Sequence, residues 1–172
     1  MKEIEVKIME VSHKDLEPKL ISLGAEKIFD DELYAIFFDT EDSKIRNSNE
    51  TFRLRKEGSK AFMTHKKKIP SESVKIREET EIEVSDFDNA RKLITSLGFK
   101  EFASIRKRRV SYKLADIRFE FDTFLDEYDF IPEFLEIEVE DINEIYKYVE
   151  LLGFSKEDCK PWSDKEVIEY YL

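Results

Sequence analysis

The stretch Glu3-Ile4-Glu5-Val6-Lys7-Ile8 alternates strictly between charged and branched apolar side chains. This period of two residues predicts a β-strand with one apolar face and one face that carries two acids and a base. The four letters EIEV recur at residues 81–84 and 136–139, so the chain repeats the same two-faced strand three times. The fold therefore has to explain why these strands carry a charged face.

The composition predicts one well-folded domain over residues 1–172, because 41% of the residues are hydrophobic and there are only 4 Gly and 4 Pro. The 29 Lys and Arg against 40 Asp and Glu give a formal net charge of -11. Since so acidic a chain repels other polyanions, we expect neither nucleic acid nor a membrane as a partner. A bound anion would need a place where the bases are gathered.

The chain has a single cysteine, Cys159, which excludes an internal disulfide framework and fits a reducing compartment. No apolar run approaches the length of a membrane span, and the N-terminus lacks the apolar region of a signal peptide. We therefore expect a soluble, cytoplasmic protein, either a monomer or a homodimer.

Each EIEV segment is followed by the same local pattern of a polar capping residue, an amphipathic stretch and a Leu-Gly pair. This pattern predicts helices that begin after Ser12, after Ser85 or Asp86 and after Asp141, and that end at a glycine. A further short helix is predicted over 163–171. Alternating segments predict more strands, at 33–40, 51–57, 60–68, 104–113 and 116–123. Eight mostly antiparallel strands with outer helices predict an α+β fold built on a closed or nearly closed antiparallel β-barrel.

Side chains of one parity share a face of a strand, and here one parity is charged while the other is apolar. The charged set, which includes the polar but uncharged Thr64, contains Glu3, Glu5, Lys7, Arg53, Arg55, Thr64, Lys66, Arg77, Glu79, Glu81, Glu83, Lys107, Arg109, Arg118, Glu120, Asp122, Glu136 and Glu138. The apolar set contains Ile4, Val6, Ile8, Phe52, Leu54, Ile82, Val84, Val110, Phe119, Phe121, Leu135, Ile137 and Val139.

Amphipathic helices need an apolar surface to pack against, so we expect the apolar parity to face outward beneath them and the charged parity to line the barrel. A charged lumen must hold water and counter-ions, since buried unpaired charges are costly. Clustered acids suit a divalent cation, and facing Arg and Lys side chains suit phosphate. The alternative is that the charges form cross-strand ion pairs on a solvated outer face. That arrangement would leave the helices nothing to cover.

The pattern of these charged residues resembles that of a known family. The pattern Glu3-x-Glu5-x-Lys7 is similar to the ExExK signature of the CYTH family, or triphosphate tunnel metalloenzymes, which includes class IV adenylyl cyclases, thiamine triphosphatases and inorganic tripolyphosphatases. Other elements of the family pattern follow in order: Tyr34 with Phe38-Asp39-Thr40, Arg53-x-Arg55, Lys66, Arg77 with its alternating acids, Lys107-x-Arg109-x-x-Tyr112, Asp122 and Glu136-x-Glu138.

The resemblance implies an eight-stranded antiparallel barrel, the triphosphate tunnel, in which bases hold phosphates and acids hold Mg²⁺ or Mn²⁺. The implied phosphate ligands are Arg53, Arg55, Lys66, Arg77, Lys107 and Arg109. The implied metal and water ligands are Glu3, Glu5, Glu81, Glu83, Asp122, Glu136 and Glu138, with no acid assigned to a particular metal. For catalysis, the resemblance implies Lys7 near the terminal phosphate and Glu5 and Glu81 beside the attacking water.

The expected activity is metal-dependent hydrolysis of a triphosphate, either tripolyphosphate or an organic or nucleoside triphosphate, by in-line attack of water on the terminal phosphorus. One alternative uses the same lumen as an adenylyl cyclase, in which the 3′-hydroxyl of ATP attacks the α-phosphorus and pyrophosphate leaves. The other alternative is a protein that binds polyphosphate or nucleotides without turnover.

Overall fold

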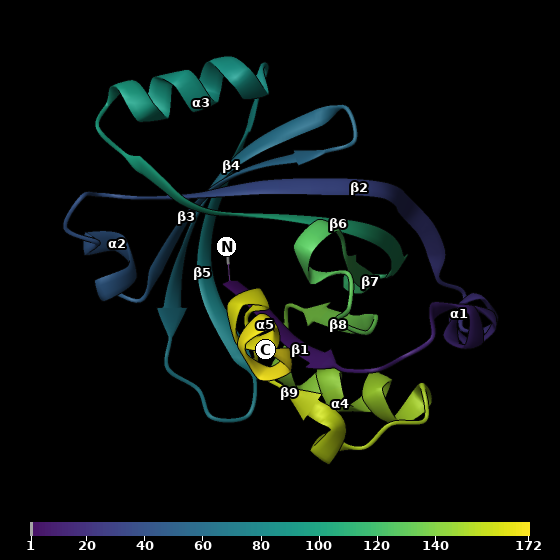
Figure 1. Cartoon of the computed structure of the whole chain (residues 1–172). Coiled ribbons are helices and arrows are strands. Elements are labelled where there is room, and N and C mark those ends of the chain that lie inside the picture. Colours follow the sequence, from purple (N-terminus) through teal and green to yellow (C-terminus); the bar gives the residue numbers. More distant parts are fainter. Residues whose placement is uncertain (1) are drawn as a thin grey trace.

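The computed structural model describes residues 2–172, and the strands of this part of the chain form one antiparallel sheet (Figure 1). The strands are β1 (Lys2–Ile8), β2 (Glu26–Asp39), β3 (Glu50–Glu57), β4 (Lys60–Ile69), β5 (Lys75–Val84), β6 (Lys100–Leu114), β7 (Ile117–Phe124), β8 (Phe134–Val139) and β9 (Cys159–Lys160). Neighbouring strands follow the order β5-β4-β3-β2-β6-β7-β8-β1, and β1 also pairs with β5. The first eight strands therefore close into the predicted antiparallel barrel, and β9 adds two residues beside β1.

Five α-helices and two short 3-10 turns lie around the barrel within residues 2–172. They are α1 (His13–Ser22), α2 (Lys44–Asn47), α3 (Phe87–Ser96), η1 (Asp126–Tyr128), α4 (Ile142–Leu151), η2 (Lys156–Asp158) and α5 (Asp164–Tyr171). The predicted N-caps are confirmed at Ser12, Asp86 and Asp141, where each side chain accepts a backbone N–H of the first helical turn. The four predicted helices are thus present.

The helices pack on the apolar parity of the strands, as predicted. Residues of α1 and α4, such as Leu20 and Val149, share one core with Val6, Phe119 and Ile137. A second core lies under α3, where Ile94 packs with Ile36, Phe38 and Leu54. Because side chains alternate along a strand, these outer contacts turn the charged parity into the lumen.

Two strands extend beyond their predicted starts. β2 begins at Glu26 instead of residue 33, and β6 begins at Lys100 instead of residue 104. The two strands pair along almost their whole length, with one register shift between Lys27 and Phe29 and another between Phe37 and Phe38. Their extra residues do not alternate cleanly in polarity, so pairing with each other, and not a buried face, holds them in the sheet.

α5 departs from the general scheme, because it packs on side chains of the charged parity. Its buried residues Val167 and Ile168 contact a small core with Phe124 and Phe134. These two rings have the same parity as Asp122 and Glu136 on their own strands, so they lie at an end of the lumen. Figure 1 shows α5 in front of the barrel, and we call this part of the lumen the covered end.

Candidate functional site

The lumen gathers charged side chains, many of which are withdrawn from solvent. Eight of its charged residues are buried: Glu3, Glu5, Lys7, Lys107, Arg109, Glu120, Asp122 and Glu136. Lys7 is 1% exposed and Asp122 is fully buried, although both are charged at neutral pH in an ordinary environment. Such burial is tolerated only where opposite charges or bound ions compensate each charge.

Lys7 of the ExExK segment sits among carboxylates. Its ammonium group donates hydrogen bonds to Glu136 and to Glu5, the latter at 3.3 Å. Glu5 also accepts a hydrogen bond from Lys75 on β5. Burial works against the charge of Lys7, but the nearby carboxylates, led by Glu136, raise the pKa of Lys7 well above its usual value. Lys7 is therefore a fixed positive charge.

Arg109 and Lys107 on β6 hold Asp122 of β7 from two sides. The Arg109 guanidinium makes two hydrogen bonds of 2.6 Å to the Asp122 carboxylate and another to Glu120. Lys107 donates to Asp122 at 2.6 Å and to Asp164 of α5 at 2.9 Å. Because both oxygens of Asp122 are already occupied by these bases, its carboxylate positions them and is poorly placed to bind a metal.

Three carboxylates form what we call the acid cluster: Glu120, Glu136 and Glu138 each offer an oxygen, and these oxygens all lie within 4.8 Å of one another. Burial and the neighbouring acids, first among them Glu120, raise the pKa of Glu138 to about 8. Burial also raises the pKa of Glu120, whereas Lys7 holds that of Glu136 well below its usual value despite burial. Glu120 and Glu138 hold protons more tightly because they are buried and because the negative charges of the cluster repel one another. A bound cation would relieve the same repulsion.

The donor set of the acid cluster fits a hard divalent cation. Mg²⁺ and Mn²⁺ prefer carboxylate oxygens and retain water molecules that can be exchanged for phosphate oxygens. Glu136 and Glu138 come from β8 and Glu120 from the adjacent strand β7, where Glu120 and Glu136 are register partners. Two neighbouring strands of an antiparallel sheet therefore hold the three ligands in a fixed arrangement.

The opposite wall, formed by β3 and β4, is basic. Among the residues described, Arg53 Nε and Nη2 and Arg55 Nε are buried without a hydrogen-bond partner. Burial and the adjacent Arg55 lower the pKa of Arg53, as expected for two like charges side by side. Lys66 is bound instead by Glu3 at 2.7 Å and by Glu79 at 2.6 Å. Arg53 and Arg55, the guanidinium pair, thus present N–H groups that an anion could accept.

The remaining predicted site residues lie toward the rim. Glu81 accepts a hydrogen bond of 2.8 Å from Thr64 and contacts Arg55 at 3.4 Å, so it supports the guanidinium pair. Glu83 is 57% exposed and lies 3.7 Å from Lys60, away from the acid cluster. Arg77 donates to the backbone carbonyl of Asn49. Glu83 is therefore the most exposed of these three residues, whereas Arg77 is the register partner of the buried Glu3.

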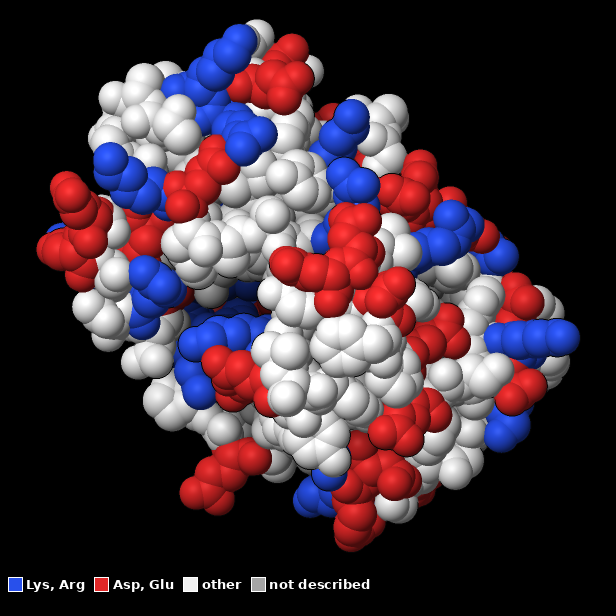
Figure 2. Space-filling view, viewed as in Figure 1, with Lys and Arg blue, Asp and Glu red and all other residues white. Residues whose placement is uncertain are grey.

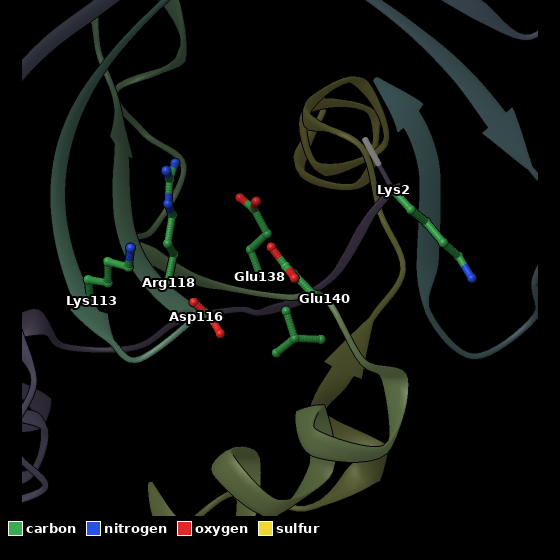
Figure 3. A pocket seen from close by; sticks show the side chains of 7 residues that line it. Lys2, Lys113, Asp116, Arg118, Glu138 and Glu140 are labelled. Carbon is green, nitrogen blue, oxygen red and sulfur yellow. The ribbon is translucent and has the colours of Figure 1, made fainter. Parts of the chain in front are cut away.

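Openings next to these charges can be followed in the figures. Figure 2 shows a hollow close to α5 with Lys and Arg on its floor, although acids cover much of the surrounding surface. A small pocket elsewhere on the barrel rim is lined by Lys113, Arg118 and Glu138 among others. In Figure 3, Arg118 and Glu138 stand side by side on neighbouring strands, while the side chain of Lys2 points away. The acid cluster is thus reachable at Glu138.

Sequence reasoning left three residues out of the site. Glu120 belongs to the charged parity but was not among the predicted metal ligands, because alternation does not distinguish an acid that binds a metal from one that pairs with a base. Lys75 precedes Arg77 by two residues, so the same alternation could have identified it. Asp164 begins a helix far along the chain, and no alternation connects it to the barrel. Its contact with Lys107 depends on how α5 packs, which no local pattern encodes.

Comparison with known proteins identifies the family. The model of the CYTH domain matches residues 1–158. A protein of Methanocaldococcus jannaschii with the provisional name adenylate cyclase is 33% identical over 155 residues, which cover 87% of this chain and 85% of that protein.

Solved structures share the fold over nearly the whole chain. The PH1012 protein of Pyrococcus horikoshii has a TM-score of 0.78 at 30% identity, and the match covers 96% of this chain and 98% of that one. A Hippeastrum protein, provisionally named an adenylyl cyclase and described as having a dominant triphosphatase activity, has a TM-score of 0.68 at 18% identity, with 98% and 96% covered. In residues 2–172, no helix is both long and apolar enough to cross a membrane.

Proposed function

The chain belongs to the CYTH domain family, and on that premise we propose that it is a metal-dependent triphosphatase that cleaves a phosphoanhydride bond inside the barrel. The substrate is tripolyphosphate or an organic or nucleoside triphosphate. The observation that carries the proposal is that one lumen has a basic wall opposite an acidic wall. Buried guanidinium N–H groups without partners stand on β3, and a three-carboxylate cluster stands on β7 and β8.

The residues divide the work of binding. Arg53 and Arg55 donate to non-bridging phosphate oxygens, and Arg109, Lys107, Lys66 and Lys7 add positive charge around the phosphate chain. Glu120, Glu136 and Glu138 would hold Mg²⁺ or Mn²⁺, with Glu3 and Glu5 close enough in the same lumen to orient water. The metal would neutralise charge on the phosphates and polarise the attacking water. Bulk water screens the buried charges less than it screens charges on the surface, so their attraction to a bound phosphate is stronger.

Cyclisation of ATP is the second candidate, and the name of the Methanocaldococcus jannaschii relative favours it. It requires the same phosphate and metal ligands but a different orientation, in which the α-phosphorus faces the ribose hydroxyl. A protein that binds polyphosphate or nucleotides without turnover would use the same phosphate and metal ligands. The reaction products therefore distinguish the three possibilities, whereas affinity does not.

The deciding experiment measures phosphate, pyrophosphate and cyclic AMP released from tripolyphosphate, ATP and thiamine triphosphate, with Mg²⁺, Mn²⁺ or EDTA. We expect metal-dependent phosphate release that falls at least about 100-fold in Glu5→Gln, since Glu5 orders both Lys7 and Lys75. Glu101→Gln is the matched control, because Glu101 pairs only with Arg91 on the outer surface among the described contacts.

Two results would contradict the proposal. Cyclic AMP with an equal amount of pyrophosphate would make the protein a cyclase. Tight binding of tripolyphosphate without any product, in the wild type and in Glu101→Gln, would make it a binding protein. The single domain over 1–172, the cytoplasmic location and the choice between monomer and homodimer stay predictions.

A further inference from the structure

Asp164 brings a carboxylate of α5 to two bases of the lumen. Its Oδ2 lies 2.9 Å from the Nζ of Lys107, and its Oδ1 lies 3.7 Å from the Nζ of Lys7. Lys7 and Lys107 come from β1 and β6, which are not neighbours in the sheet. One carboxylate of α5 thus contacts the ammonium groups of two strands that are not neighbours, at the covered end of the lumen.

The position of Asp164 is fixed by the packing of its helix. Ser163 and Glu166 form a capping box at the start of α5, and Val167 and Ile168 are buried one turn later. The Phe134 ring lies beneath both ammonium groups, 5.7 Å from each Nζ. Asp164 therefore cannot move away from the lysines without exposing this apolar contact.

The carboxylate occupies the kind of position that a phosphate would take. Two ammonium groups that contact one anion match the charge of a phosphate group and can donate to its oxygens. Burial opposes the charge of Asp164, yet Lys107 and Lys7 hold its pKa below the usual range. The Asp164 side chain is thus an anion at neutral pH that contacts two bases of the lumen.

We propose that Asp164 is a specificity-determining residue that limits how many phosphates of a polyphosphate chain the lumen accepts. This inference rests on the proposed function. The guanidinium pair and the positive charge of the surrounding bases serve the phosphates of a triphosphate. Asp164 takes the contacts that Lys7 and Lys107 could offer to a further phosphate. A longer chain would have to place its additional phosphate where this carboxylate already stands, and like charges would repel it.

The two lysines keep capacity for a phosphate when Asp164 is removed. Lys7 retains Glu136 and Glu5, and Lys107 retains Asp122. An ammonium group has three donors, so each lysine can add one bond to a phosphate oxygen without giving up its other partners. Truncation of Asp164 to alanine also makes room for a phosphate group. Replacement by asparagine, which has the same size, would not.

The test measures calorimetric binding of tripolyphosphate and of linear tetrapolyphosphate, both in EDTA so that no metal takes part. The proteins are the wild type, Asp164→Ala, Asp164→Asn and Glu169→Ala. Glu169 lies on the same helix, is 59% exposed and pairs with Lys165, so its truncation removes an equal charge away from the lumen.

We expect Asp164→Ala to raise the affinity for tetrapolyphosphate relative to tripolyphosphate by at least about tenfold, the lower end of what one charge-assisted hydrogen bond contributes. Asp164→Asn should shift the ratio in the same direction by less, because it removes the charge but leaves the volume. Glu169→Ala should keep the ratio of the wild type. The fluorescence of Trp162, which immediately precedes the cap of α5, checks that the helix stays docked in each variant.

An unchanged ratio in both Asp164 variants, with α5 docked and tripolyphosphate still bound, would overturn the role of Asp164 and leave the proposed function standing. The same shift in Glu169→Ala would also overturn it, because net charge alone would then explain the effect. If none of the four proteins binds either polyphosphate in EDTA, the lumen bases alone do not hold a phosphate chain and this inference is overturned. The proposed function is then decided separately, by product release in the presence of Mg²⁺ or Mn²⁺.

Discussion

The two arginines of β3 show how single residues can be poorly satisfied in the free protein and well suited to a ligand. Arg53 and Arg55 lie two residues apart on one face of the strand, and three of their buried nitrogen atoms lack a partner among the described residues. A native protein satisfies nearly all of its buried donors. Two like charges with unused donors are costly in the free protein, and a triphosphate would remove that cost on binding.

The first prediction concerns Arg53→Met, which keeps an elongated side chain but removes the charge and the donors. We expect the affinity for tripolyphosphate to fall about 10- to 100-fold, because a guanidinium contributes about 1.5–3 kcal/mol through charge-assisted bonds. The free energy of unfolding without ligand should stay the same or rise by roughly 1 kcal/mol, since repulsion from Arg55 is relieved. Calorimetry and urea denaturation measure the two quantities.

Arg108→Met on the same barrel is the control, because Arg108 is 53% exposed and pairs with Asp30 on the outer surface. It should change the affinity less than twofold, consistent with the small contribution of an exposed ion pair. A loss of stability in Arg53→Met without loss of affinity would mean that Arg53 is structural and that the guanidinium pair does not bind phosphate.

At the scale of the element, α2 is held chiefly by one side chain, that of Asp39. Asp39, which is 1% exposed, accepts backbone N–H groups of Thr40, Ile45 and Arg46 at 2.8, 2.9 and 3.2 Å, and the Arg46 Nε at 2.8 Å. A helix of four residues cannot be stable by its own hydrogen bonds. Asp39 therefore holds α2 at the end of β2.

The second prediction is that Asp39→Ala lowers the free energy of unfolding by about 2–4 kcal/mol, because several partly buried donors lose a charged acceptor at once. Asp39→Asn should recover part of this loss, since its amide oxygen can still accept. Glu41→Ala is the control, because Glu41 is an exposed acid directly after Thr40. Equal stability of the Asp39 and Glu41 variants in urea denaturation would show that α2 forms without the Asp39 acceptor.

The sequence predicted the elements whose pattern is local. Alternation along β1, β3 and β8 identified both the strands and the face that lines the lumen, because burial beneath helices fixes one parity. The same rule failed for α2, whose stability comes from the buried carboxylate of Asp39 and not from a periodic face. It also failed for the early residues of β2 and β6, which are held mainly by pairing with each other.

The site was predictable as a set of charges but not as an arrangement. Alternation places Glu81, Glu83 and Asp122 on the same face as Glu136, yet only Glu136 and Glu138 of the predicted metal ligands come together, with Glu120. Which acids remain free depends on which bases reach them across the lumen, as Arg109 reaches Asp122. These contacts link distant strands, so strand register and side-chain length decide them.

At the scale of the whole molecule, folding brings repelling carboxylates together in a protein that already carries a formal net charge of -11. In the metal-free protein the acid cluster lowers this repulsion by keeping protons, as the raised pKa of Glu138 and that of Glu120 indicate. A protein built in this way should be more stable with a bound cation than without one, and the difference should depend on pH.

The third prediction follows from the sign of that shift. The pKa of Glu138 rises from 4.5 to about 8 on folding, so between these pH values the folded protein holds a proton that the unfolded chain has released. Rising pH therefore removes stability until about pH 8. We expect the melting temperature in EDTA to fall by roughly 2–4 °C between pH 6 and 8, which corresponds to about 1 kcal/mol in a chain of this size.

Bound Mn²⁺ should reverse this dependence, because the metal takes deprotonated carboxylates and its affinity rises with pH. Glu138→Gln should flatten the pH profile in EDTA and also lose most of the stabilisation by Mn²⁺, since the variant has no charge to protonate and one metal ligand fewer. Glu140→Gln is the control and should behave as the wild type, because Glu140 is exposed and lines the same small pocket as Glu138. If Glu138→Gln kept the full stabilisation by Mn²⁺, the metal would bind elsewhere in the lumen, and the acids around Glu3 and Glu5 would be the next to test.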